Sequence, residues 1–369
     1  MLTYVMKILA IDTSCDDTCA SVLDNDRIIT NIVSSQIEIH KSWGGVVPNL
    51  AKRAHEEKID AVIAEAITGQ ITNHKSQDPN KLQISISNFQ KYMDDIDVIG
   101  VTVGPGLSPA LGVGVNKAKK LAKKYKKKLV AVNHIEAHLL SVFLKDEKGE
   151  PDREIELPAL ALTVSGGHTK IVLIKKIGDY EILGETLDDA AGEALDKAAK
   201  LMDVDYPGGP IIEKMAKEGK SDFLKLPMPM KGQSGYNLSF SGLKTAFYYA
   251  IKDWSKEKVE ENKVNLAASF QKAVFDSLIN RFEKAVEDMW PKSLIGVGGV
   301  MNNENLRQRL VKLGEKRNIK VYFPYSKALN GDNAAMVGMV AYTKALRGEF
   351  VEDIEKLDRE PKLDLRFKI

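Results

Sequence analysis

Short apolar runs separated by polar turns occupy the N-terminal part of the chain. In residues 7–33, one run ends at Asp12, a second follows the polar stretch 14–18, and a third follows the turn at 24–26. Apolar runs of this length bounded by turn residues predict β-strands. The pattern therefore predicts three successive strands.

The same order returns from Pro158 onward. An apolar run leads to the small-residue turn 165–167, a second run leads to the turn 178–179, and a third run follows. Further strands and helices alternate after each block. In the first half a strand is expected at 97–107, a helix at 108–125 and a strand at 128–134, followed by a helix that carries two histidines. In the second half they are expected at 189–202, 263–289 and 293–299, then in helices from Asn303 and Asp332.

Two α/β halves with the same element order predict an internally duplicated fold. We expect lobes at 1–157 and 158–369, joined by the polar segment 145–157. Residues 70–93 lack clear periodicity and predict a surface loop or weak helix. Residues 221–240 predict an ordered functional loop.

Composition narrows the class of protein. With 44% hydrophobic and 28% charged residues the chain reads as a soluble globular protein, and its net charge of +2 excludes a polycation. Any affinity for nucleic acid must come from local patches. We expect a cytoplasmic protein, because no membrane-spanning run or signal peptide is evident. Cys15 and Cys19 are expected to be packing residues, and Met6 is as natural a start as Met1.

The most informative local pattern is a histidine pair. His134 and His138 are two of only six histidines and are spaced i, i+4 in a stretch that reads as helical, with Asn133 as a candidate N-cap. Residues with this spacing share a helix face, so both rings can reach one metal ion. Glu136 would point to the other side of the helix, unlike the glutamate of an H-E-x-x-H protease helix.

A third ligand is available in Asp332, which precedes another predicted helix. Its carboxylate could cap that helix. It could equally complete a site with two histidines, a set that leaves coordination positions open for catalysis.

Glycine turns follow three apolar strands, at 104–106, 165–167 and 298–299. Such turns allow backbone N–H groups to approach an anion and favour nucleotide binding, although tight turns need glycine in any case. A further turn at 206–210 could admit a sugar or a purine. The run 117–128 holds eight lysines, which predicts a solvated helix face or a contact with a phosphate backbone.

Many segments resemble one family, in its order and spacing. They are IDTSCDDT, SQIEIHKSWGGVVPNLAKRAH, VGPGL, NHIEAH, TVSGGHT, LGETLDDAAGEALDKAAKLM, DYPGGP, LSFSGLKT, GVGGVMNN and GDNAAM. The chain thereby resembles the bacterial tRNA adenosine threonylcarbamoyltransferases, formerly labelled O-sialoglycoprotein endopeptidases.

The resemblance implies an α/β fold of the duplicated actin/hexokinase/Hsp70-like (ribonuclease H-like) type, with an interlobe cleft. It implies transfer of threonylcarbamoyl from threonylcarbamoyl-AMP to the exocyclic amine of adenosine 37 in tRNA, releasing AMP. Implied partners are tRNA, a non-catalytic paralogue of the same fold, a small P-loop ATPase and the threonylcarbamoyl-AMP synthase. ATP or AMP could occupy the same cleft.

The family's functional positions also map onto this sequence. The metal ligands, for Fe²⁺ or Zn²⁺, fall on His134, His138 and Asp332. The adenylate contacts fall on Thr163, Val164, Ser165, Gly166, Gly167, Asp196, Gly209 and Asn303.

The chain departs from the family at several positions. Asp12 and Asp17 replace two glutamates, and 70–93 resembles an insertion. After Gly299 the chain has Met301-Asn302-Asn303 where the family commonly has a small residue and then Ala-Asn, and Asn303 is the best match. Three rival functions are a metallopeptidase, an ATPase or kinase of the same fold, and a non-catalytic scaffold paralogue.

Overall fold

A computed structural model of the chain describes residues 5–69 and 86–365. The chain forms two compact units. The first contains the residues up to Ile39, Val46–Glu154 and the segment from Pro324 onward, and the second contains His40–Gly45 and Ile155–Phe323. This division differs from the predicted lobes 1–157 and 158–369, because the C-terminal segment packs with the first unit. The predicted surface segment 70–93 lies outside the described residues as far as residue 85.

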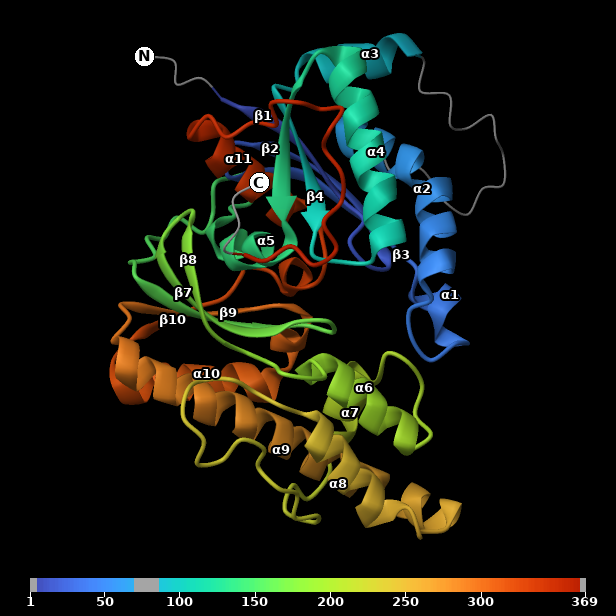
Figure 1. The fold of residues 1–369 in the computed structure, drawn as a ribbon, viewed down its shortest axis with the longest axis vertical. Coiled ribbons are helices and arrows are strands. Elements are labelled where there is room, and N and C mark those ends of the chain that lie inside the picture. Colours follow the sequence, from blue (N-terminus) through green and yellow to red (C-terminus); the bar gives the residue numbers. More distant parts are fainter. Residues whose placement is uncertain (1–4, 70–85, 366–369) are drawn as a thin grey trace. The chain divides into compact units, whose positions relative to one another are not determined.

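The first unit is built on a five-stranded sheet (Figure 1). Its strands have the order β3-β2-β1-β4-β5, in which β1 is antiparallel to β2 and parallel to β4. The bounds are β1 Lys7–Asp12, β2 Asp17–Asp24, β3 Arg27–Ser35, β4 Val98–Gly104 and β5 Lys128–Asn133. The three strands predicted in residues 7–33 are therefore present.

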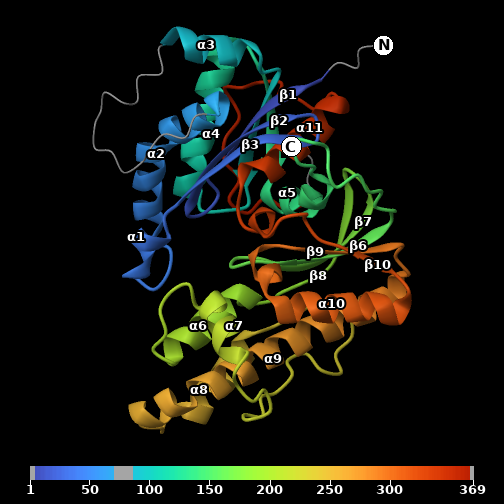
Figure 2. The same cartoon turned by 180° about the vertical axis from the view of Figure 1, so that it is seen from behind.

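Helices cover both faces of this sheet. α2 and α4 pack together on one face, where Leu9 and Ile11 of β1 meet Ile63 and Val115, and α11 covers the other face (Figures 1 and 2). The helical bounds are α1 Ile37–Lys41, α2 Pro48–Thr68, α3 Ile86–Asp94, α4 Ser108–Tyr125, α5 His134–Leu140 and α11 Ala334–Leu346, with 3-10 turns η2 Ser141–Phe143 and η4 Lys327–Asn330.

The second unit repeats the sheet of the first. Its order β10-β9-β6-β7-β8 has the same topology when its strands are renumbered from β6, which confirms the predicted duplication. The strands are β6 Ala159–Val164, β7 Thr169–Lys176, β8 Asp179–Glu185, β9 Ser293–Val297 and β10 Lys320–Tyr322. The helices are α6 Ala191–Leu201, α7 Gly208–Ala216, α8 Ser241–Ile251, α9 Lys256–Met289 and α10 Glu304–Arg317, with the 3-10 turn η3 Gly299–Asn302.

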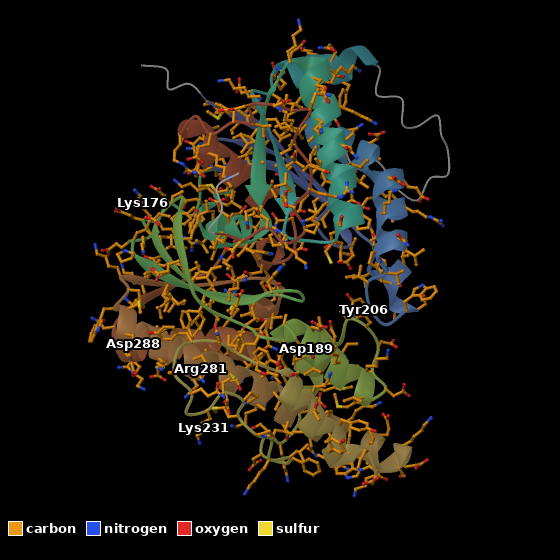
Figure 3. The ribbon with its side chains drawn as sticks, viewed as in Figure 1. Lys176, Asp189, Tyr206, Lys231, Arg281 and Asp288 are labelled. Carbon is orange, nitrogen blue, oxygen red and sulfur yellow. The ribbon has the colours of Figure 1, made fainter. Side chains whose placement is uncertain are left out.

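The predicted ordered loop 221–240 is held down by one buried arginine of α9. Arg281, which is 5% exposed, donates hydrogen bonds to the carbonyl groups of Met230, Gln233 and Gly235 (Figure 3). Tyr236 donates its hydroxyl hydrogen to Asp288 at 2.7 Å. Arg281 and Asp288 of α9 thus hold this loop, the first through its backbone and the second through the Tyr236 side chain.

The lysine-rich run of α4 holds the C-terminal strap, which we define as residues 347–365. Lys119 donates to the carbonyl oxygens of Glu355 and Leu357 at 2.9 and 2.7 Å, and Lys123 pairs with the Glu355 carboxylate. Part of the run is therefore structural, which neither interpretation from the sequence had included. Among the described residues, none of the helices is both long and apolar enough to span a membrane.

Candidate metal centre and adenylate-contact turns

The two histidines lie at the start of α5, directly after β5. The Asn133 side chain accepts hydrogen bonds from the N–H groups of Ile135 and Glu136 at 2.8 and 3.2 Å, which confirms it as the N-cap. The rings of His134 and His138 are 4.7 Å apart between centroids and nearly perpendicular. Both side chains are buried.

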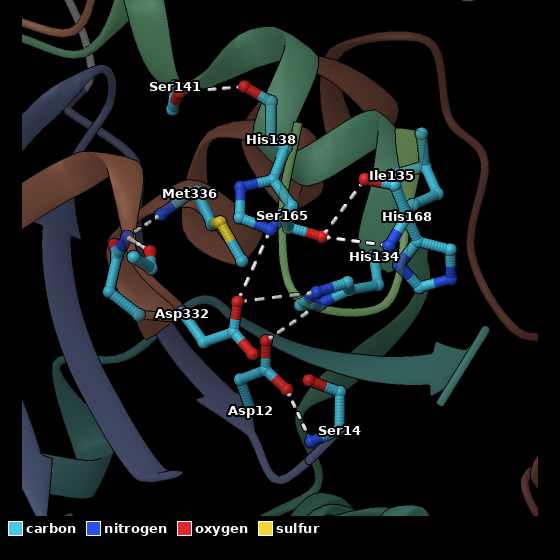
Figure 4. A network of polar contacts seen from close by, with 12 residues as sticks. Asp12, Ser14, His134, Ile135, His138, Ser141, Ser165, His168, Asp332 and Met336 are labelled. Atoms are coloured by element: carbon cyan, nitrogen blue, oxygen red, sulfur yellow. Dashed lines mark hydrogen bonds and ion pairs between the residues drawn. The ribbon is translucent and has the colours of Figure 1, made fainter. Parts of the chain in front are cut away.

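Asp332 completes this cluster from the segment before α11. Its Oδ1 lies 3.5 Å from Nε2 of His134 and 3.3 Å from Nε2 of His138 (Figure 4). The cap of α11 is Asn333, whose side chain accepts from the N–H of Met336 at 3.1 Å. Asp332 therefore does not serve as the cap. All three residues belong to the first unit, although Asp332 lies in the second half of the sequence.

The donor set fits a divalent transition metal. The ligand atoms of His134, His138 and Asp332 lie within 4.8 Å of one another. Among the described residues, they form the one group of three or more His, Cys, Asp or Glu side chains that are close enough together to hold a metal ion. Zinc–ligand bonds of about 2.0–2.1 Å separate the ligands of a tetrahedron by about 3.3–3.4 Å. The two nitrogen–oxygen separations are close to that value.

The three groups influence one another's protonation. Burial alone would lower the pKa of His134, but the carboxylates of Asp332 and Asp12 outweigh it and raise that pKa to about 10. Burial lowers the pKa of His138. Burial opposes ionisation of Asp332, yet the neighbouring histidines hold its pKa well below the ordinary value. A bound cation would replace a proton here.

A fourth side chain, Asp12, contacts His134. Its Oδ2 lies 3.2 Å from Nδ1 of His134, and its Oδ1 accepts from the N–H of Ser14 at 2.7 Å (Figure 4). In the sequence, Asp12 stands out only as a substitution for glutamate. Its position at the carboxyl end of β1, in a sheet where β1, β4 and β5 are parallel, was the signal that could have identified it.

Glu136 does not join the cluster, as predicted. It is buried, and its Oε2 lies 3.9 Å from Nζ of Lys344. The two cysteines are not paired with each other, and burial raises the pKa of both thiols, in keeping with packing residues.

The first glycine turn serves packing. A Cβ at Gly104 would overlap the carbonyl of Glu360 in the strap, and one at Gly106 would lie 2.5 Å from the carbonyl oxygen of Ser14. The interpretation of residues 104–106 as an anion-binding turn is therefore corrected. Gly298 is likewise close to Val164, with a positive φ of 95°.

The second glycine turn is different, because it borders open space. Apart from adjoining residues and the backbone of the same helix, no atom of the described structure lies within 4 Å of a Cβ built at Gly166, Gly167 or Gly209. The turn follows Thr163 and Val164 at the carboxyl end of β6, where open α/β sheets bind ligands. Close backbone approach by a ligand is thus sterically allowed there.

Asp196 and Asn303 have structural partners of their own. Oδ1 of Asp196 accepts from the N–H groups of Gly208 and Gly209 at 2.8 and 3.1 Å, which fixes the start of α7. Asn303 caps α10 and donates to Gln271 at 2.7 Å. Both residues therefore shape the turns around the open glycines, and their contact with a ligand remains a prediction.

The LSFSGLKT segment contains the start of α8, and the carboxylate of Asp188 binds it there. The sequence alone offers no physical interpretation of this segment. Asp188 accepts hydrogen bonds from the hydroxyl groups of Ser239 and Ser241 and from the N–H groups of Phe240 and Ser241, at 2.5–3.2 Å. These bonds tie the first turn of α8 to the loop that precedes α6.

Comparison with known proteins gives a consistent result. A sequence model of the family described as TsaD, tRNA N6-adenosine threonylcarbamoyltransferase, matches residues 27–339. A protein with that name from Clostridium perfringens is 44% identical over 360 residues, 97% of each chain. Another from Thermosipho africanus is 42% identical over 343 residues, 93% of this chain and 96% of the relative.

Solved structures resemble the chain in fold. HypF of T. kodakarensis has a TM-score of 0.56 at 14% identity, covering 96% of this chain and 49% of that one. A phosphate- and nucleotide-bound HypF has a TM-score of 0.53 at 12% identity, covering 92% and 46%. With the repeated sheet order, these likenesses support the predicted actin-like fold.

Proposed function

Because the chain belongs to the tRNA N6-adenosine threonylcarbamoyltransferase family, we propose that it transfers threonylcarbamoyl from threonylcarbamoyl-AMP to the exocyclic amine of adenosine 37 in tRNA, releasing AMP. The observation that carries this proposal is the alignment with such enzymes over nearly the whole length of both chains. The cluster of buried His134 and His138 with partly exposed Asp332 supports it, since a scaffold has no need of two buried imidazoles beside a carboxylate.

In this proposal His134, His138 and Asp332 hold one divalent ion, iron or zinc, since two imidazoles and a carboxylate suit both. When bound, such an ion supplies Lewis acidity toward a carbonyl oxygen. The chain itself holds His134 and His138 on the capped helix α5, where both are buried, and it presents Asp332 from the segment before α11. Because the donor is already activated, positioning and charge stabilisation account for much of the rate, and a side-chain nucleophile is not required.

The second unit would bind the donor through its adenylate. Gly166, Gly167 and Gly209 leave space for close backbone approach, and Thr163, Val164 and Ser165 form the strand end that leads to it. Asp196 and Asn303 hold the adjoining helix starts in place.

Two of the rival functions, the metallopeptidase and the non-catalytic scaffold, are less well supported. A metallopeptidase needs a base beside the metal-bound water, whereas Glu136 is buried near Lys344. A non-catalytic scaffold is less well supported because the chain keeps all three ligand residues.

By the same family relation we propose a cytoplasmic enzyme that acts on tRNA. It would work with a non-catalytic paralogue of the same fold, a small P-loop ATPase and the synthase that supplies threonylcarbamoyl-AMP.

The test is reconstitution with tRNA, threonine, bicarbonate, ATP and these partner enzymes, followed by nucleoside analysis of the tRNA. His134→Ala should lose modified adenosine while still binding tRNA, and Glu136→Gln, the matched control on the same helix, should retain activity. Full activity in His134→Ala would contradict the metal-centred proposal. Peptide hydrolysis that depends on Glu136 would favour the metallopeptidase.

A further inference from the structure

The carboxylate of Asp12 contacts the nitrogen of His134 that faces away from Asp332. We propose that Asp12 is a positioning residue, which accepts the Nδ1–H of His134 and thereby leaves Nε2 as the atom that binds the metal. The inference rests on the metal site proposed above, and goes beyond it by assigning a role to a residue outside the ligand set.

The contact is buried and rigid. Asp12 is 1% exposed and His134 is 4% exposed, so water does not compete for the hydrogen bond. The second carboxylate oxygen is already occupied by the N–H of Ser14 at 2.7 Å. The carboxylate is thus held at both oxygens, and its orientation is defined before any ion arrives.

The backbone around Asp12 is also fixed. Thr13 donates its hydroxyl hydrogen to the carbonyl of Ala110 at 2.9 Å and accepts from the N–H of Gly114 at 3.1 Å. The N–H of Leu107 donates to the carbonyl of Ser14 at 2.8 Å. These bonds fasten the β1–β2 turn to the start of α4, so Asp12 is presented from a rigid support.

The consequence for the ligand is chemical. A neutral imidazole carries one N–H, and a hydrogen bond to a carboxylate decides which nitrogen keeps it. His138 has no such support, because within the described residues its buried Nδ1 has no hydrogen-bond partner. Asp12 and Asp332 together also carry two negative charges, which match a divalent cation bound by two neutral histidines.

The experiment measures metal binding directly. Metal-free protein is titrated with Co²⁺, and with Zn²⁺ in competition with a chelator, for the wild type, Asp12→Ala and the near-isosteric Asp12→Asn. Asp97→Asn is the matched control, since Asp97 accepts from the N–H of Lys7 at 2.8 Å at the opposite end of β1, about 17 Å away along the strand.

We expect Asp12→Ala to weaken metal binding about 10–100-fold and to change the visible absorption of bound Co²⁺. Asp12→Asn keeps an acceptor and should lose less, and Asp97→Asn should leave both readouts unchanged. If Asp12→Ala does not fold, a loss of affinity in Asp12→Asn decides the question.

The possible results distinguish the role of Asp12 from the existence of the metal site. A wild-type protein that binds no ion stoichiometrically would refute the metal site itself. Stoichiometric wild-type binding with the same affinity and Co²⁺ spectrum in the Asp12 variants would refute only the role of Asp12. Lower thermal stability without a change in affinity or spectrum would likewise reduce Asp12 to a packing residue.

Discussion

Replacing Gly104 with alanine should detach the C-terminal strap from the end of β4. The new Cβ would overlap the carbonyl of Glu360, and overpacking of this kind costs about 1–3 kcal/mol. Moving the strap would also break the bonds from Glu360 N–H to Val103 (2.7 Å) and from Gly106 N–H to Pro361 (3.2 Å), at about 0.5–1.5 kcal/mol each. The expected loss is therefore about 2–6 kcal/mol.

Denaturant unfolding measures this loss, and hydrogen exchange at the amides of Glu360 and Gly106 locates it. Gly242→Ala is the control, because nothing lies within 4 Å of a Cβ at Gly242. If Gly104→Ala stays within about 0.5 kcal/mol of wild type, the range of ordinary surface substitutions, and both amides keep their protection, the strap does not depend on this contact.

Three further results are expected. Gly166→Ala should fold with wild-type stability, because space is open there, yet should raise the KM for the adenylate donor; an unchanged KM would remove the turn from the binding site. Arg281→Met should leave three loop carbonyls without their donor and speed proteolysis within 228–236, and equal cleavage rates would contradict the structure. Partial burial by itself would raise the pKa of Asp188, but hydrogen bonds from Ser239 and Ser241 keep that pKa below its ordinary value. That stabilisation is fully present above the pKa of the unfolded carboxyl group, about 3.9, and it is lost as the pH falls through the lower pKa of the folded protein. The difference in Tm between wild type and Asp188→Asn should therefore be largest at neutral pH and should shrink in acid. A Tm difference that does not vary with pH would contradict this.

Local pattern was enough to predict the parts of the molecule whose cause is local. The strands of residues 7–33, the helix 108–125 and the Asn133 cap follow from periodicity and from side chains bonding to nearby backbone. The duplication followed from element order. The spacing of His134 and His138 predicted a shared face because a helix fixes that geometry.

What the sequence did not reveal depends on segments far apart in the chain. Gly104 looked like an anion-binding turn because its neighbour, Glu360, lies 256 positions away. Asp12 was missed because its contact with His134 arises only when β1 and β5 join one sheet. The two serines of LSFSGLKT were uninterpretable without Asp188, which reaches them from another loop.

The second unit is inserted within the sequence of the first, since residues from Pro324 onward return to pack with the N-terminal sheet. We therefore expect a ribosome-bound chain that ends before this point to lack one covering helix of the first sheet, α11, together with Asp332. The second unit can fold at that stage of synthesis, whereas the first unit cannot complete its fold before its C-terminal segment has been made. If His134, His138 and Asp332 form the metal site proposed above, a chain cut short before residue 332 lacks one of its three ligands and should bind the ion more weakly.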